Sequence, residues 1–133
     1  MNFLSLNSAT NSPSVSVFIN NNHVDTIISE FKSSSILPSI TNEILIKNNL
    51  KIPDLNYITI TIGPGSFTGL RVGLSLAQGL SYSGSLSIAP VNLLDVFISK
   101  INSNDNALAA FHSHGDFIFS KHIKNDSATR LTN

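Results

Sequence analysis

The hydrophobic and polar pattern at the start of the chain predicts three short strands. Residues 3–6 read as a buried strand, and residues 14–19 alternate before turning apolar, which is typical of a second strand. Residues 20–22 are three asparagines, which tolerate positive φ and predict a hairpin turn into a third strand at 23–28. Residues 7–13 are dense in turn formers and read as a loop. The chain is therefore expected to begin as an antiparallel meander.

Farther along, apolar residues recur at helical spacing, and short apolar runs stand between these stretches. Helices separated by strands indicate a mostly parallel central sheet, which makes the expected fold an α/β lobe with an antiparallel addition at one edge. The predicted elements are a helix at 37–50, a strand at 57–62, a glycine turn at 63–69, a helix at 70–82 stopped by Gly84, a strand at 85–89, a helix at 90–101, and a hairpin of strands 107–111 and 117–123 around the turn 112–116, followed by a frayed tail at 124–133.

Composition narrows the functional classes. The 133 residues suit one domain, with 41% hydrophobic and 12% charged residues and a net charge of zero. Electrostatic binding of long nucleic acid is disfavoured, because it needs clustered Lys and Arg. The chain has no cysteine, so thiol chemistry and thiolate metal sites are excluded. No signal peptide or membrane-spanning run is visible, and a cytoplasmic protein is expected.

The segment from strand 57–62 into the following helix is the most distinctive part of the chain. Arg71 is the only formally charged residue between Leu55 and Leu94. A strand that leads through a glycine turn into a helix is the usual layout of an anion site, although the P-loop and dinucleotide patterns are absent. The alternative is that the glycines only make the reversal, with Ser66 as the helix N-cap. The candidate phosphate-binding residues are Gly63, Gly65, Ser66 and Thr68.

Small residues recur at steps of four along the helix that leaves this turn: Gly69, Gly73, Ala77 and Ser81. The helical glycines, Gly79 included, would together cost about 2–3 kcal/mol relative to alanine, so a close neighbour must offset them. That neighbour is either the chain's own sheet or a helix of another molecule. An uncharged face of small residues on a neutral domain suits a protein interface.

Catalytic readings find little support. Activation of Ser66 or Thr68 as a nucleophile needs an oriented base, and the histidines are distant in sequence. His112 and His114 alternate along a strand edge and could share a face, but two residues are too few for a closed metal site. The acidic residues are scattered singly, so no carboxylate pair is proposed. No catalytic residue, metal or cofactor is assigned.

The run at 62–73, Ile-Gly-Pro-Gly-Ser-Phe-Thr-Gly-Leu-Arg-Val-Gly, resembles the TsaB (YeaZ-like) family of bacterial tRNA threonylcarbamoyladenosine biosynthesis proteins. Further stretches agree with that family's pattern, and the resemblance covers about residues 3–123. These stretches are 6–10, 33–38, 77–80 and 90–94.

The resemblance implies an actin-like fold of two ribonuclease-H-like lobes and a scaffold that is not itself a catalyst. Its partner would be the TsaD transferase, with the TsaE ATPase joining the complex and tRNA bound only indirectly. The first-lobe helices at 37–50 and 67–82 would meet the partner. The residues assigned to that surface are Leu37, Ile40, Ile44, Phe67, Gly69, Leu70, Arg71, Gly73, Leu74, Ala77 and Ser81.

Several positions depart from the family pattern. Asn7 replaces an aspartate that in actin-like ATPases helps manage the nucleotide's metal, Phe119 replaces a tyrosine, and residues 112–114 replace Asp-Ala-Arg. By the resemblance, residues 1–104 form the first lobe, 105–123 open a second lobe that is largely absent, and 124–133 are a tail. Two rival functions remain open: a nucleotide-binding actin-like enzyme that uses the glycine turn, and an inactive remnant that dimerises.

Overall fold

The computed structural model describes residues 1–30, 34–101, 106–112 and 117–123, so the predicted tail, the tip of the last hairpin and His114 lie outside the described residues. The elements, in chain order, are β1 (Phe3–Asn7), β2 (Ser14–Ile19), β3 (Asn22–Ile28), η1 (Ser34–Ile36), α1 (Leu37–Lys47), η2 (Ile52–Asp54), β4 (Tyr57–Gly63), α2 (Phe67–Gly84), β5 (Ser87–Asn92), α3 (Leu93–Ile98), β6 (Ala107–His112) and β7 (Ile118–Ile123).

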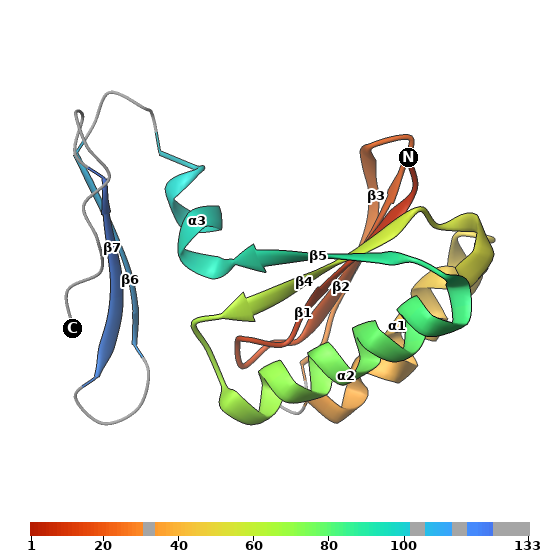
Figure 1. Cartoon of the computed structure of the whole chain (residues 1–133), viewed down its shortest axis with the longest axis horizontal. Helices are drawn as coiled ribbons and strands as arrows, with labels where there is room; N and C mark the ends of the chain where they lie inside the picture. Colours follow the sequence, from red (N-terminus) through yellow and green to blue (C-terminus); the bar gives the residue numbers. More distant parts are fainter. Residues whose placement is uncertain (31–33, 102–105, 113–116, 124–133) are drawn as a thin grey trace.

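The five-stranded sheet has the order β3-β2-β1-β4-β5 (Figure 1). Strands β1, β2 and β3 pair antiparallel, whereas β4 pairs parallel with both β1 and β5. Asn20 and Asn21 both have positive φ and turn β2 into β3. The predicted meander and the mixed sheet are therefore confirmed.

Helices α1 and α2 cover the same face of this sheet (Figure 1). Alternate residues of the central strands point to that face and pack against the inner sides of the helices. The hydrophobic core therefore lies between the sheet and the helix layer. On the opposite face, the Phe3 ring stacks between Phe18 and Tyr57, with centroid separations of 4.3 and 4.5 Å. The main core residues are Leu4, Leu6, Val15, Val17, Leu37, Ile40, Ile44, Ile58, Ile60 and Ala77.

Four predicted helix boundaries are wrong. Pro90 belongs to β5 rather than to the next helix, because β5 is an edge strand and tolerates a residue without a backbone N–H. The helix begins at Leu93, after Asn92 caps it by accepting from the Leu94 N–H, and it ends at Ile98 instead of residue 101. Helix α2 continues past residue 82 to Gly84, its last residue, and Ser85 caps it in the left-handed conformation. Helix α1 stops at Lys47, three residues before the predicted end.

The last two strands form the predicted hairpin as a separate two-stranded sheet beyond α3 (Figure 1). Ala109 is buried, and Lys121 on β7 forms an ion pair with Asp95 on α3. These contacts connect the hairpin to the short helix that follows the five-stranded sheet. Within the described residues, no helix is both long and apolar enough to span a membrane.

Candidate docking site

The turn between β4 and α2 sets the direction of α2. Gly63 has a φ of +117°, a conformation that side-chain-bearing residues rarely adopt. Ser66 is the N-cap, as predicted, and its hydroxyl accepts from the Gly69 N–H at 3.2 Å. The turn therefore starts α2 with a satisfied cap close to the end of β1.

The small residues of α2 pack on the loop between β1 and β2 of the same chain. A Cβ at Gly69 would come within 2.1 Å of the Ser8 carbonyl oxygen, and one at Gly73 within 2.1 Å of the Ser8 hydroxyl. A Cβ at Gly65 would lie 2.3 Å from the carbonyl oxygen of Ala9. Close packing within the chain, one of the two alternatives that the sequence left open, thus explains Gly65, Gly69 and Gly73, whereas a Cβ at Gly79 would meet no atom within 4 Å.

This packing corrects much of the predicted partner surface. Gly69, Gly73 and Ala77 are buried against the chain's own sheet and loop, where no partner can reach them. The hydroxyl of Ser81 donates to the Leu86 carbonyl, which engages it locally. The three predicted partner residues of α1 are also core residues, namely Leu37, Ile40 and Ile44.

The opposite side of α2 is exposed and largely uncharged. Phe67, Leu74 and Tyr82 have 74%, 43% and 92% of their surface accessible, and Arg71 and Gln78 are also exposed. These five residues recur every three or four positions and so share one helical face. We call Phe67, Arg71, Leu74, Gln78 and Tyr82 the outer face of α2.

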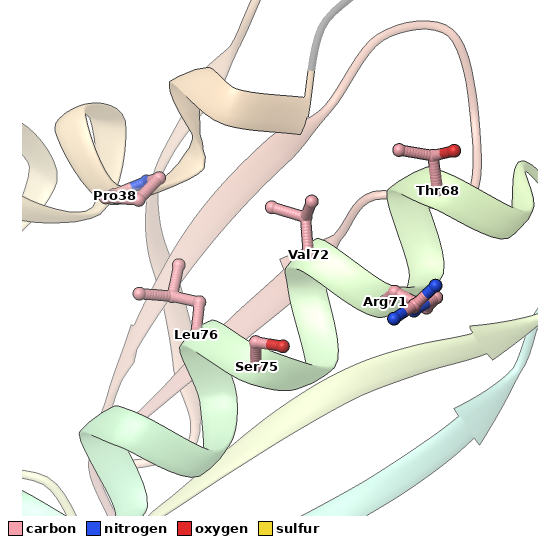
Figure 2. A pocket seen from close by; sticks show the side chains of 6 residues that line it. All are labelled: Pro38, Thr68, Arg71, Val72, Ser75 and Leu76. Carbon is pink, nitrogen blue, oxygen red and sulfur yellow. The ribbon is translucent and has the colours of Figure 1, made fainter.

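A groove of about 550 Å³ runs between this helix and the start of α1. Thr68, Val72 and Leu76 project from α2 toward Pro38 of α1, while Arg71 and Ser75 lie along the neighbouring side of α2 (Figure 2). Among the lining residues that the structure describes, Arg71 alone carries a formal charge, and its guanidinium lies 5.5 Å from the centre of the Phe67 ring. Of the predicted partner residues, Phe67, Arg71 and Leu74 therefore remain accessible beside an apolar groove.

The predicted phosphate site has fewer free donors than the sequence suggested. The Ser66 N–H donates to the Ala9 carbonyl at 2.9 Å, and the Gly69 N–H is used by the cap. Gly65 faces Ala9, so its missing side chain makes room for protein backbone. Thr68 is turned into the α1–α2 groove. Phosphate binding by this turn stays a prediction that the geometry does not favour.

A second hollow, of about 790 Å³, lies between the turn and the last hairpin. Leu70, predicted as a partner residue, lines this hollow instead of the groove. Asn7 is not directed to a ligand here, because its side chain accepts from the Ala9 N–H and donates to the Thr10 hydroxyl. Among the described residues, no cluster of three or more His, Asp or Glu side chains is placed to hold a metal.

Sequence reasoning missed two parts of the site. Gln78 and Tyr82 complete the outer face, and their spacing from Arg71 could have revealed them. Ser8 and Ala9 are the residues that the glycines of the turn and of α2 contact. The sequence of residues 7–13 indicated only a loop of turn formers. The small side chains of Ser8 and Ala9 were the available signal, because a close backbone approach needs small residues on both sides.

Comparison of the fold defines the class of protein. The solved structure described as YeaZ from Pseudomonas aeruginosa superposes with a TM-score of 0.77 at 18% identity, covering 99% of this chain and 64% of that chain. The five-stranded sheet with α1 and α2 on one face is thus the first lobe of an actin-like, ribonuclease-H-like fold.

The sequence comparisons then give the family. The family model described as "TsaD: tRNA N6-adenosine threonylcarbamoyltransferase" matches residues 27–114, and the chain belongs to that family. Among its members the chain is TsaB-like. It is 27% identical over 124 residues to the tRNA threonylcarbamoyladenosine biosynthesis protein TsaB of Haemophilus influenzae, covering 90% of this chain and 52% of that protein.

A transferase is similar over a shorter stretch. The tRNA N6-adenosine threonylcarbamoyltransferase of Sulfurisphaera tokodaii is 42% identical over 59 residues, which is 44% of this chain and 18% of that protein. The chain spans about half the length of the Haemophilus protein. The TsaB resemblance seen in the sequence is therefore confirmed for the lobe that these residues form.

Proposed function

We propose that the chain is a non-catalytic subunit of tRNA threonylcarbamoyladenosine biosynthesis that binds a TsaD-type transferase. The transferase would dock on the outer face of α2 and on the groove beside α1. A TsaE-type ATPase would join through the complex, and tRNA would be reached only through the transferase. The hairpin β6–β7 would be the opening of a second lobe.

The outer face of α2 carries this proposal. Tyr and Arg are enriched among the residues that dominate binding energy, and Phe is enriched in interface cores; here all three lie on one exposed helix face. Leu74 adds aliphatic surface between them, and the groove offers a recess for a partner side chain. Because the opposite side of α2 packs closely on Ser8 and the sheet, the exposed side would lose little freedom on binding.

A binding role is better supported than phosphoryl chemistry. The N–H groups of Ser66 and Gly69 at the start of α2 are engaged inside the chain, and the side chain of Asn7 organises its own loop. The relatives' names place them in one tRNA modification pathway, either as TsaB or as the transferase itself. A partner subunit of the same pathway fits both observations.

The test is calorimetric titration of the full chain with the transferase of the same organism, followed by reconstitution of tRNA modification. Leu74→Arg would place a charge inside the contact, and we expect it to weaken binding by at least about tenfold. Tyr82→Ala would weaken binding in the same direction. The matched control is Val24→Arg on β3, since Val24 is 47% exposed and lies away from α2, and it should bind like the wild type.

Three outcomes would contradict the proposal. The first is that the wild type fails to bind the transferase. The second is that Leu74→Arg and Val24→Arg bind equally well. The third is that the chain hydrolyses a nucleotide in isolation, which would favour the actin-like enzyme. Self-association that Leu74→Arg abolishes, without any transferase binding, would identify the outer face as a homodimer surface.

A further inference from the structure

Arg71 is a single charge within the described part of an otherwise uncharged surface. It is the only formally charged residue between Leu55 and Leu94, and therefore the only one of α2. The other described residues of the groove and of the outer face carry no formal charge. Among the described residues, the ion pairs join Lys47 to Asp25 and Lys121 to Asp95, and neither involves Arg71.

The helix dipole does not explain the position of Arg71. Arg71 is the fifth residue of α2, nearer the positive end of the helix dipole, where a cation is not favoured. Its guanidinium lies 5.5 Å from the ring centre of Phe67, which is itself 74% exposed. A contact with an aromatic face engages the cation without using its N–H donors, so these donors can still bind an acceptor of another molecule.

A partner that covers this surface would have to provide Arg71 with a hydrogen-bond acceptor. A partner that fills the apolar groove removes water from the guanidinium, and a desolvated cation without an acceptor is strongly unfavourable. A carboxylate satisfies the guanidinium best, because its two oxygens match two parallel N–H donors. Backbone carbonyls would supply acceptors but would not neutralise the charge.

We propose that Arg71 is the specificity-determining residue of the docking surface and that it pairs with an Asp or Glu side chain of the transferase. This inference rests on the proposed function and adds the chemistry of the contact. The acidic side chain would lie within an otherwise apolar patch of the partner, opposite the groove between Pro38 and Leu76. The pair would fix the register of the two surfaces, which apolar packing alone leaves loosely defined.

The first experiment compares Arg71 variants in titrations of the full chain with the transferase. Arg71→Gln removes the charge and should weaken binding by about thirtyfold, the loss expected for a hot-spot residue. Arg71→Lys keeps the charge but loses the paired donors, so its affinity should fall between those of Arg71→Gln and the wild type. Wild-type affinity should fall with added salt more steeply than that of Arg71→Gln.

The matched control is Lys51→Glu, which changes the net charge as much as Arg71→Glu does. Lys51 is exposed and lies next to η2, which packs near the C-terminal end of α2, away from Arg71. Arg71→Glu should abolish measurable binding, whereas Lys51→Glu should stay within about twofold of the wild type. Because Arg71 is exposed, all of these variants should melt at the wild-type temperature.

The decisive step is a charge swap. Each Asp and Glu on the surface of the transferase is changed to Arg and tested against Arg71→Glu, and one such change should restore binding. The inference is overturned if no single change restores it, or if Arg71→Gln binds within about twofold of the wild type while Leu74→Arg does not bind. In that second case the proposed docking still stands.

Two other occupants of the site would also overturn the inference. If the chain alone binds inorganic phosphate and Arg71→Gln abolishes that binding, Arg71 belongs to an anion site. If the chain alone self-associates, and Arg71→Gln and Glu43→Gln each abolish this without affecting transferase binding, Arg71 pairs with the exposed Glu43 of a second copy. Wild-type failure to bind the transferase contradicts the proposed function itself.

Discussion

Gly73 lies so close to Ser8 that a Cβ at position 73 would come within 2.1 Å of the Ser8 hydroxyl oxygen. The same Cβ would stand 3.0 Å from the Ile60 side chain and 3.2 Å from the Ser8 Cβ. Ser8 is buried, and its hydroxyl has no hydrogen-bond partner among the described residues. This contact positions α2 on the sheet. It thereby determines which side of α2 is buried and which side forms the exposed outer face.

Gly73→Ala should therefore destabilise the fold. The added methyl group overpacks a closed contact, which typically costs about 1–3 kcal/mol. The double variant Ser8→Ala/Gly73→Ala should recover part of that loss, because the nearest clashing atom is gone. Urea unfolding followed by circular dichroism gives the free energies of unfolding for the single and double variants.

Ser8→Ala alone is the control for this cycle. Removing an unsatisfied buried hydroxyl should leave the stability unchanged or raise it slightly. Equal stability of wild type and Gly73→Ala would contradict the assigned contact. A larger residue such as leucine at position 73 would disturb the fold itself, so loss of partner binding in such a variant would not locate an interface.

Gly79→Ala is expected to act in the opposite direction. A Cβ at Gly79 meets no atom within 4 Å, and the residue is an exposed interior position of α2. Alanine should stabilise the protein by about 1 kcal/mol through helix propensity. Thermal melting of Gly79→Ala, measured together with Gly73→Ala, compares two glycines of the same helix. If Gly79→Ala melted below the wild-type temperature, position 79 would not be open.

Ser66→Ala tests the start of α2. The Ser66 hydroxyl accepts from the Gly69 N–H, and its loss should cost about 1 kcal/mol, the usual value of an N-cap. Ser66→Asp retains an acceptor and should unfold at a urea concentration close to that of the wild type. If the two variants were equally destabilised, the cap would contribute nothing and packing on Ala9 alone would set the turn.

The strands were predictable because their patterns are local. The alternation at Ser14–Ile19 and the three asparagines after it require no knowledge of distant residues. The start of α3 was not predictable in this way, because Pro90 suits a helix start and an edge strand equally well. Only the order of strands in the sheet decides between these possibilities.

The candidate site shows the same limit. The stripe of small residues on α2 indicates a close neighbour, but glycine spacing is identical for a contact within the chain and for one between chains. The neighbour proved to be Ser8, about sixty residues away in sequence, which no local pattern identifies. Phe67, Arg71 and Leu74 of the exposed side were assigned to the partner surface from the sequence. Tyr82 was missed, because its exposure depends on which elements pack around it in the fold.

The contact of Asp25 with the end of α1 makes a prediction about acid. Lys47 lies 2.9 Å from the Asp25 carboxylate, and Asn48 donates to the same oxygen at 3.2 Å. The side-chain hydrogen bond from Lys47, and then that from Asn48, lower the pKa of Asp25 below its ordinary value. A carboxylate with a lowered folded-state pKa stabilises the fold above its unfolded pKa of 3.8 and loses this contribution as the pH falls through the folded value.

Wild-type stability should therefore decline more steeply than that of Asp25→Asn below about pH 4. Urea unfolding at a series of pH values measures this, with Asp54→Asn as an exposed control, and parallel curves for wild type and Asp25→Asn would show that the contact does not stabilise the fold.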